Sequence, residues 1–154
     1  MKRSLCAAWA CALASTLSCH AYAQGYTDPG PDVTQHEYAP QKVVYQVNSG
    51  DDIVQKAVLR NVMNEYAALD GKMTAVIVVH GNGITVLQSA DEDVQKLLAE
   101  VRAKGIKIDV CNNTLKERNI DWHTLKNVTH SDLVRSGVTE VVSLQQQGYI
   151  YLKP

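Results

Sequence analysis

A short and almost uninterrupted run of apolar residues, 74–79 (TAVIVV), is the feature that most restricts the fold of this chain. A strand with apolar residues on both sides of its pleat must be covered on both faces. Sheets buried on both faces are typically parallel. We therefore expect residues 74–79 to be an inner strand of a mostly parallel sheet.

The segments on either side of this strand alternate between strand and helix patterns. Residues 42–47 (KVVYQV) predict a first strand, and after a turn at Asn48 to Asp51 apolar residues recur at helical spacing as far as Gly71. The members of this helical stripe are Val54, Val58, Val62 and Tyr66, with Ile53, Ala57 and Leu69 beside them. Ser89 and Glu92 form a possible capping box for a second helix that ends at Gly105. Its inner face consists of Val94, Leu97, Leu98 and Val101.

The last third of the chain continues the alternation. Residues 106–111 predict a strand, a short helix is expected to open at about Thr114, and a fourth strand is expected within 128–134. Residues 136–147 are rich enough in β-branched side chains for a strand, but their helical spacing and the stop at Gly148 favour a helix. Residues 149–152 (YIYL) predict the final strand. Strands and helices in alternation predict an α/β sandwich with about five mostly parallel strands.

The first 23 residues have the pattern of a secretory signal peptide. Lys2 and Arg3 precede an apolar run that is too short to span a bilayer, and Ala21-Tyr22-Ala23 has the form of a cleavage site. A lipoprotein with Cys19 as the lipidated residue is the alternative. We expect the mature chain to be periplasmic or secreted, with no membrane span, and residues 24–41 to form an extended arm before a single domain of residues 42–154.

Cleavage changes both the charge and the cysteine content. Removal of Lys2 and Arg3 leaves 13 of the 15 basic residues against 16 acidic ones, without runs of either sign, which gives no basis for binding nucleic acid. Three of the four cysteines lie in the leader, so Cys111 is the only cysteine of the mature chain and no internal disulfide is possible. Such a thiol is either buried and inert or reactive.

The position of Cys111 favours a reactive thiol. It stands at the carboxyl end of its predicted strand, directly before Asn112, Asn113 and Thr114, which are good helix N-cap residues, and Glu117 completes a possible capping box with Thr114. The unpaired N–H groups of a helix start stabilise a thiolate. We therefore expect Cys111 to be the reactive group of the protein.

Three turns are expected to border one pocket beside this cysteine. Right-handed crossovers place the turns that follow the strands on one edge of the sheet, and ligands of open α/β sheets bind at that carboxyl edge. The candidate ligand-binding residues in these turns are Asn48, Gly81, Asn82, Asn112, Asn113 and Thr114. The alternative for the asparagines is a purely conformational role in tight turns.

His80 is the second candidate catalytic residue, since it ends the strand of residues 74–79. A Cys–His couple raises the alternative of acyl transfer, and a purely structural histidine is the further alternative. His123 and His130 do not form a usual metal-ligand pattern with Cys111, so we expect no metal. The glycine turn after His80 is too short for a nucleotide-binding loop, so no cofactor is expected.

Three segments together resemble a known family. They are VIVVHGNGI at 76–84, VCNNTL at 110–115 after a Gly-Ile strand start, and SGVTEVVSLQQQGYIYLKP at 136–154. Residues 42–154 resemble the small exported members of the DsrE/DsrF-like family. The resemblance implies a flavodoxin-like three-layer α/β/α fold, assembly into homotrimers or hexamers, and sulfur relay with a persulfide on the cysteine at the position of Cys111. It implies as partners a sulfur donor or acceptor protein, or a small sulfur species.

Two hypotheses of different kinds follow. In the first, Cys111 accepts or carries sulfane sulfur with His80 beside it. In the second, the same homo-oligomeric scaffold binds a small ligand or a partner protein without catalysis, and Cys111 plays no part.

Overall fold

The computed structural model describes residues 38–154, so the predicted leader and most of the predicted arm lie outside the described residues. The strands of the described part are β1 (Gln41–Val47), β2 (Met73–Val79), β3 (Lys107–Cys111), β4 (Leu133–Val134) and β5 (Ile150–Leu152). Its α-helices are α1 (Asp52–Ala68), α2 (Glu92–Ala103), α3 (Asn112–Glu117) and α4 (Gly137–Gln146). Its 3₁₀ helices are η1 (Gly81–Leu87), η2 (Trp122–Thr124) and η3 (His130–Asp132).

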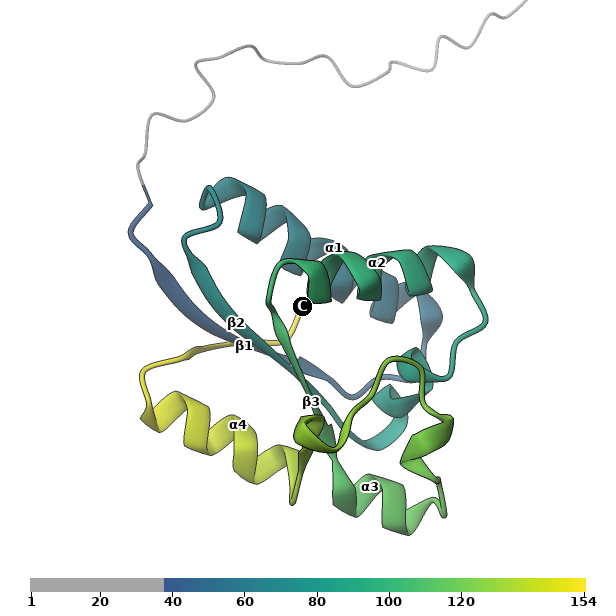
Figure 1. The fold of residues 1–154 in the computed structure, drawn as a ribbon. Coiled ribbons are helices and arrows are strands. Elements are labelled where there is room, and N and C mark those ends of the chain that lie inside the picture. The colour runs from purple at the N-terminus through teal and green to yellow at the C-terminus, as the bar shows by residue number, and fades with distance from the viewer. Residues whose placement is uncertain (1–37) are drawn as a thin grey trace, which may run out of the picture. The chain divides into compact units, whose positions relative to one another are not determined.

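The strands form one sheet in the order β4-β3-β2-β1-β5, and all four pairings are parallel. Helices α1 and α2 cover one face of the sheet, and α4 covers the other (Figure 1). The predicted three-layer α/β/α sandwich is therefore confirmed. The order of the strands differs from the 2-1-3-4-5 order of flavodoxin itself, so the likeness to flavodoxin concerns the layers.

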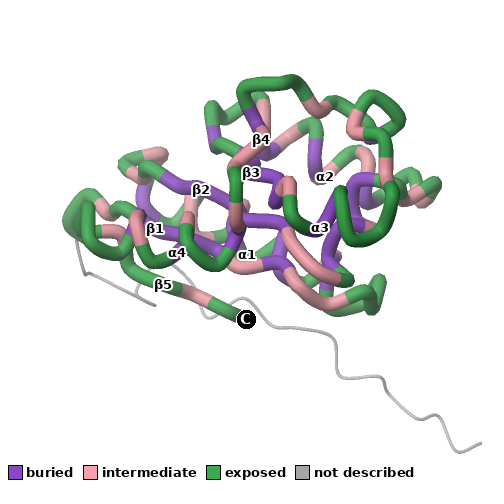
Figure 2. Tube along the Cα trace, turned by 90° about the horizontal axis from the view of Figure 1, so that it is seen from below, coloured by how far each residue is buried: buried purple, intermediate pink, exposed green. Residues whose placement is uncertain are grey.

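The two faces of the sheet carry cores of unequal size. Within residues 38–154, 20 buried apolar residues form the cluster beneath α1 and α2, whereas five form the cluster beneath α4. The five are Val44, Val76, Val78, Val141 and Leu144. Figure 2 shows buried positions following β1, β2 and β3 through the molecule. The run TAVIVV supplies both clusters, because successive side chains of a strand point to opposite faces.

Strand β3 has buried positions on both faces. Apolar residues alternate with Lys107 and Asp109 along the strand, but Asp109 is 0 % exposed and lies on the same face of the strand as Cys111. The ammonium nitrogen of Lys107 lies 2.7 Å from Oδ1 of Asp109. Burial raises the pKa of the Asp109 carboxyl, and the contact with Lys107 only partly offsets this effect.

The buried face of α1 differs from the predicted stripe. Ile53 and Val54 are exposed, and Ala57 is exposed as well, whereas Gln55 and Leu59 are buried. The Gln55 amide accounts for the difference, because its Nε2 donates to the Ser49 carbonyl and to the Thr85 hydroxyl, each at 2.7 Å. These two bonds fix the first turn of α1 with Gln55 facing inward. The prediction counted Ile53, Val54 and Ala57 among the inward-facing residues of the helix, and it was wrong for these three residues.

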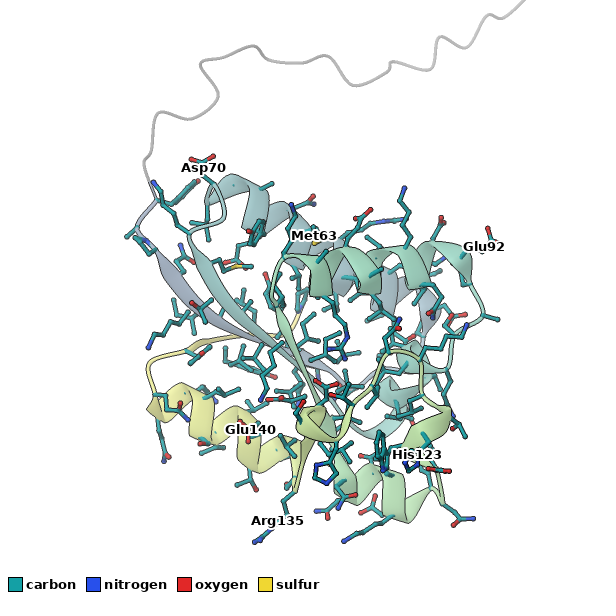
Figure 3. All side chains as sticks on the ribbon, in the orientation of Figure 1. Met63, Asp70, Glu92, His123, Arg135 and Glu140 are labelled. Carbon is teal, nitrogen blue, oxygen red and sulfur yellow. The ribbon has the colours of Figure 1, made fainter. Side chains whose placement is uncertain are left out.

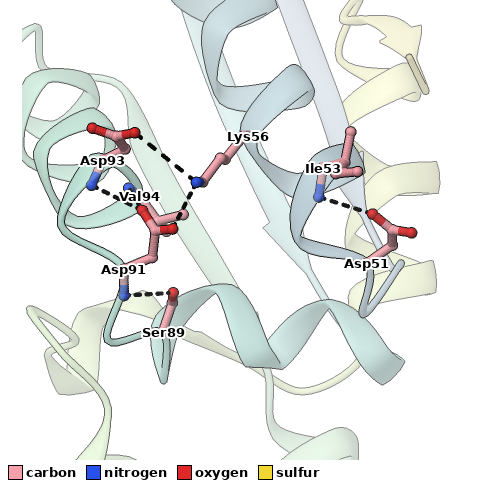
Figure 4. Close-up of polar contacts among 7 residues, drawn as sticks. All are labelled: Asp51, Ile53, Lys56, Ser89, Asp91, Asp93 and Val94. Atoms are coloured by element: carbon pink, nitrogen blue, oxygen red, sulfur yellow. Dashed lines mark hydrogen bonds and ion pairs between the residues drawn. The ribbon is translucent and has the colours of Figure 1, made fainter.

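The N-cap of α2 is Asp91, so the predicted capping box of Ser89 and Glu92 was wrong. The Asp91 carboxylate accepts hydrogen bonds from the backbone N–H groups of Asp93 and Val94, while the Ser89 hydroxyl accepts from the N–H of Asp91 (Figure 4). Lys56 of α1 reaches the same carboxylate, with 2.6 Å between Nζ and Oδ2. This bond raises the pKa of Lys56 and lowers that of Asp91, and it joins α1 to the start of α2.

The C-terminal part of the chain follows the prediction in outline. The helix expected in residues 136–147 is α4, with Ser136 as its N-cap, and the expected final strand is β5. The strand expected within residues 128–134 is confined to the two residues of β4, because reciprocal hydrogen bonds between Thr129 and Asp132 fold the preceding segment into η3. Figure 3 shows Arg135 and Glu140 on the side of the sheet that α4 covers, opposite Met63 of α1.

Among residues 38–154, no helix combines the length and the apolar character needed to cross a membrane.

The start of η1 packs so closely on the end of β1 that only glycine fits at position 83. A Cβ atom there would lie 2.1 Å from the carbonyl oxygen of Val47. We predict that Gly83→Ala lowers the free energy of unfolding by about 1–3 kcal/mol, the usual effect of overpacking, as measured by urea denaturation. At Gly50 an added Cβ meets the Cβ of exposed Asn82 at 3.3 Å, so Gly50→Ala is the control with a smaller expected loss. Equal stability of Gly83→Ala and wild type would contradict this packing.

Candidate functional site

Cys111 is both the last residue of β3 and the N-cap of α3. The helix therefore begins at Asn112, two residues earlier than the predicted start at Thr114, and the capping box predicted for Thr114 and Glu117 was wrong. The physical reason is a contact outside the local sequence. The Thr114 hydroxyl accepts a hydrogen bond from the N–H of Gly81, with 2.9 Å between nitrogen and oxygen, and so is not used as a cap.

Four hydrogen-bond donors lower the pKa of the Cys111 thiol. They are the Thr114 hydroxyl, the N–H groups of Asn113 and Thr114 at the start of α3, and the N–H of Gly137 at the start of α4. Burial of the side chain alone would raise the pKa of the Cys111 thiol. The hydrogen bonds from these donors outweigh that effect, so the pKa of Cys111 lies below its ordinary value. Two helix starts therefore lower the pKa of the thiol, whereas the sequence predicted one.

Gly137 brings the start of α4 into contact with both predicted catalytic residues. A Cβ atom at position 137 would lie 2.9 Å from the Cβ of His80 and 3.2 Å from the Cβ of Cys111. Any side chain at this position would push α4 away from the sheet. The small residue thus allows its own N–H to reach the sulfur. Sequence reasoning missed Gly137, although its place directly after the N-cap residue Ser136 marks it as the first residue of the helix.

His80 lies beside Cys111, at the end of the neighbouring strand. Val79 pairs with Val110 in the sheet, so the next residues, His80 and Cys111, follow at the same level and on the same face. His80 is half-buried. Burial lowers the pKa of the imidazole, and the positive charge of Lys153 lowers it further. Both effects favour the neutral imidazole.

The imidazole bonds to an amide rather than to the cysteine. Nε2 of His80 lies 2.6 Å from Nε2 of Gln46, and the Tyr151 hydroxyl donates to Oε1 of the same amide. Within residues 38–154, no hydrogen bond joins His80 to Cys111. Acyl transfer by a Cys–His couple needs a hydrogen bond between the nucleophile and its base, so the geometry gives no support to that alternative.

The predicted ligand-binding residues divide into two groups. Gly81, Asn113 and Thr114 surround Cys111 through the hydrogen bonds described above. Within residues 38–154, no hydrogen bond joins the side chain of Asn48, Asn82 or Asn112 to the sulfur. Asn82 accepts from the Arg118 guanidinium, Asn48 borders a cavity of about 40 Å³ at the end of β1, and Asn112 lines a groove of about 470 Å³ along α3.

The two other histidines of the described chain belong to a separate cluster around Trp122. The His123 ring stacks on Trp122 with 3.8 Å between ring centroids, and its Nδ1 lies 2.6 Å from Oδ1 of Asp121. His130 meets the edge of Trp122. Residues 38–154 contain no group of three or more His, Cys, Asp or Glu side chains arranged to hold a metal ion.

Access to the sulfur is restricted. Cys111 is only 5 % exposed. The groove along α3 and a second groove of about 480 Å³ at the opposite end of the sheet are lined by neither Cys111 nor His80.

A family model and solved structures match this chain. The model of the DsrE/DsrF-like family matches residues 41–154. The structure of MTH1491 from Methanobacterium thermoautotrophicum, a protein of unknown function, is 27 % identical with a TM-score of 0.67, over 74 % of this chain and 99 % of that one. The structure of the ychN protein from E. coli is similar in fold, with 13 % identity, a TM-score of 0.57 and the same coverage of 74 % and 99 %. A comparison with curated proteins gives no match.

The Thr114 hydroxyl offers a direct test of the sulfur's environment. We predict that Thr114→Val raises the pKa of Cys111, because one of the donors to the sulfur is lost. For a hydrogen bond of about 1 kcal/mol, alkylation by iodoacetamide at pH 7 slows about fivefold. Thr114→Ser keeps the hydroxyl and serves as the control. Identical alkylation rates in the valine variant and the wild type would contradict the assigned bond.

Gly137 offers a second test, which separates the start of α4 from the start of α3. We predict that Gly137→Ala moves α4 outward, removes its N–H from the sulfur, raises the pKa of Cys111 and lowers the free energy of unfolding by about 1–3 kcal/mol. The measurements are the pH profile of alkylation and urea denaturation. Val138→Ala changes the next residue, whose side chain is exposed, and is the control. An unchanged alkylation midpoint in Gly137→Ala would show that α4 does not act on Cys111.

Proposed function

Because the chain belongs to the DsrE/DsrF-like family, we propose that Cys111 accepts sulfane sulfur and carries it as a persulfide. The observation that carries this proposal is the lowered pKa of Cys111, to which donors at two helix starts contribute. A sulfur acceptor needs a thiolate near neutral pH more than it needs a base. The lowered pKa of Cys111 favours that thiolate, and no charged partner contributes to it.

The transfer step is a thiol exchange. The Cys111 thiolate attacks the outer sulfur of a donor persulfide, R–S–SH, and a bond forms between Sγ and that sulfur. The bond between the two donor sulfurs breaks, and its electron pair leaves with the donor as the thiolate R–S⁻. The proton remains on the transferred sulfur, so the product is Cys111–S–SH and no oxidant is needed.

The same donors serve both halves of a carrier's cycle. In the resting state they stabilise the thiolate that makes the attack. When a sulfur acceptor attacks the outer sulfur, Sγ of Cys111 becomes the leaving group, and the N–H groups of Asn113 and Gly137 stabilise the negative charge that returns to it. A thiol of low pKa is also the better leaving group.

We extend the proposal to the setting in which the carrier works. The leader pattern of residues 1–23 supports export to the periplasm or the medium. Exposed apolar side chains support assembly of copies of this chain into a homotrimer or hexamer. They include Val138 and Val142, one turn apart on the outer side of α4, and Ile150 on the edge strand β5. A donor or acceptor protein, or a small sulfur species, completes the relay.

A second function is favoured by one observation, the 5 % exposure of Cys111. In this alternative the scaffold binds a small ligand or a partner protein as a homo-oligomer, and the cysteine is an inert core residue. A buried thiol of this kind reacts slowly with alkylating agents and takes up no sulfur.

One mass measurement distinguishes the two functions. The mature protein is treated with polysulfide, or with thiosulfate and a sulfurtransferase, and its intact mass is recorded under native conditions. We predict a gain of about 32 Da, one sulfur atom bound as a persulfide, which is removed by a thiol reductant. Cys111→Ser is the control and gains nothing. Slow alkylation near neutral pH together with no added sulfur would reject the carrier and leave the binding module.

A further inference from the structure

A row of polar side chains crosses the sheet on the face covered by α4. It begins with Tyr151 on β5, continues with Gln46 on β1 and His80 directly after β2, and reaches Cys111 at the end of β3, so that the four residues come from successive strands of the sheet. The first three are joined by hydrogen bonds, from the Tyr151 hydroxyl to Oε1 of Gln46 and between Nε2 of Gln46 and Nε2 of His80 at 2.6 Å. The mechanism of sulfur transfer described above uses neither Tyr151 nor Gln46.

The chemistry of an amide makes this row directional. The oxygen of a glutamine side chain only accepts hydrogen bonds, and its nitrogen only donates. Since Oε1 of Gln46 accepts from Tyr151, the NH₂ group of Gln46 faces His80. Nε2 of His80 must then be the acceptor, with a free lone pair. In a neutral imidazole the single proton is consequently on Nδ1.

We propose that Gln46 and Tyr151 are positioning residues for His80, which keep its imidazole neutral with the proton on Nδ1. The inference deepens the proposed function and rests on it for its purpose, but the state of the ring can be measured without any sulfur chemistry. An imidazolium carries N–H groups at both nitrogens, and the one on Nε2 would face the NH₂ group of Gln46. The arrangement therefore opposes protonation of His80.

The charged surroundings of His80 act in the same direction. Lys153, directly after β5, is the charged side chain that bears on the imidazole, and its positive charge disfavours a second cation. Tyr151 on β5 donates to Gln46, Cys111 on β3 is the neighbouring titratable group, and α4 contributes the backbone of Gly137. Arg118 of the following loop is engaged by Asn82.

For the site, this means that His80 does not supply the charge that stabilises the thiolate. A neutral His80 does not act as the cation of a thiolate–imidazolium pair, so the thiolate of Cys111 depends on the N–H and hydroxyl donors alone. The ring then offers one N–H donor, at Nδ1. The alkylation rate of Cys111 should then follow a single titration, with no second step from His80.

The test is ¹⁵N NMR of the full mature chain with labelled histidine, which reports the protonation of each ring nitrogen. The His80 signal is identified by its loss in His80→Asn. We expect a pyrrole-type Nδ1 and a pyridine-type Nε2 that persist through pH 6–8. A proton on Nε2 instead, which is the state required by the opposite orientation of the Gln46 amide, would overturn the proposal.

Variants give the proposal a second measurement. Gln46→Glu places a carboxylate at Nε2, and we expect the midpoint of His80 to rise by about one unit or more, with a second step in the pH profile of Cys111 alkylation. Gln88→Glu adds the same charge at an exposed position and is the matched control. An unchanged His80 midpoint in a folded Gln46→Glu protein would overturn the role of Gln46.

Tyr151→Phe tests the outer end of the row at a partly exposed residue where loss of folding is not expected. Without the hydroxyl the Gln46 amide is free to reverse, so we expect a mixture of the two His80 tautomers. A tautomer identical to that of the wild type would remove Tyr151 from the proposal. Because these readouts involve no sulfur donor, failure of the mass measurement would reject the carrier without affecting them.

Discussion

The contact on which the site depends is the one between the start of α4 and the ends of β2 and β3. Gly137 fits between His80 and Cys111 where a Cβ atom would meet both side chains closer than van der Waals contact. Backbone N–H groups at the starts of two helices lower the pKa of the single buried thiol. Burial of an ionisable thiol normally favours its neutral form. Here the donors reverse the preference, so the same packing that hides the sulfur also makes it acidic.

The layers of the fold could be predicted because their signals are local. The apolar run TAVIVV indicates an inner strand, and the helical spacing of residues 136–147 indicates α4. The ends of the predicted strands then give the positions of His80 and Cys111. The family match over residues 41–154 agrees with the resemblance drawn from three short segments. Right-handed crossovers then require the two residues to share one edge of the sheet.

The details that failed depend on partners distant in sequence. Thr114 was predicted as an N-cap, but its hydroxyl accepts a hydrogen bond from the N–H of Gly81. Asn82 was predicted as a ligand-binding residue, but its side chain accepts from Arg118. The cap at Asp91 gains Lys56 from another helix. Gln46 and Tyr151 were interpreted only as strand residues, because the bonds from Tyr151 to Gln46 and between Gln46 and His80 require the strand order β2-β1-β5, which no local pattern contains. The raised pKa of Asp109 likewise results from burial of its carboxyl in the folded protein, which the local sequence does not show.

The unequal cores give the two sides of the sheet different resistance to local unfolding. Within the described residues, α4 is held by a cluster of five buried apolar residues, whereas α1 and α2 share a cluster of 20. Cooperative units with few buried apolar contacts open at lower free energy than the rest of a protein, and their amide protons exchange with solvent sooner. The helix that shields Cys111 is thus the one that detaches most readily. Brief excursions of α4 would admit a reagent to the sulfur while the opposite side of the molecule stays folded.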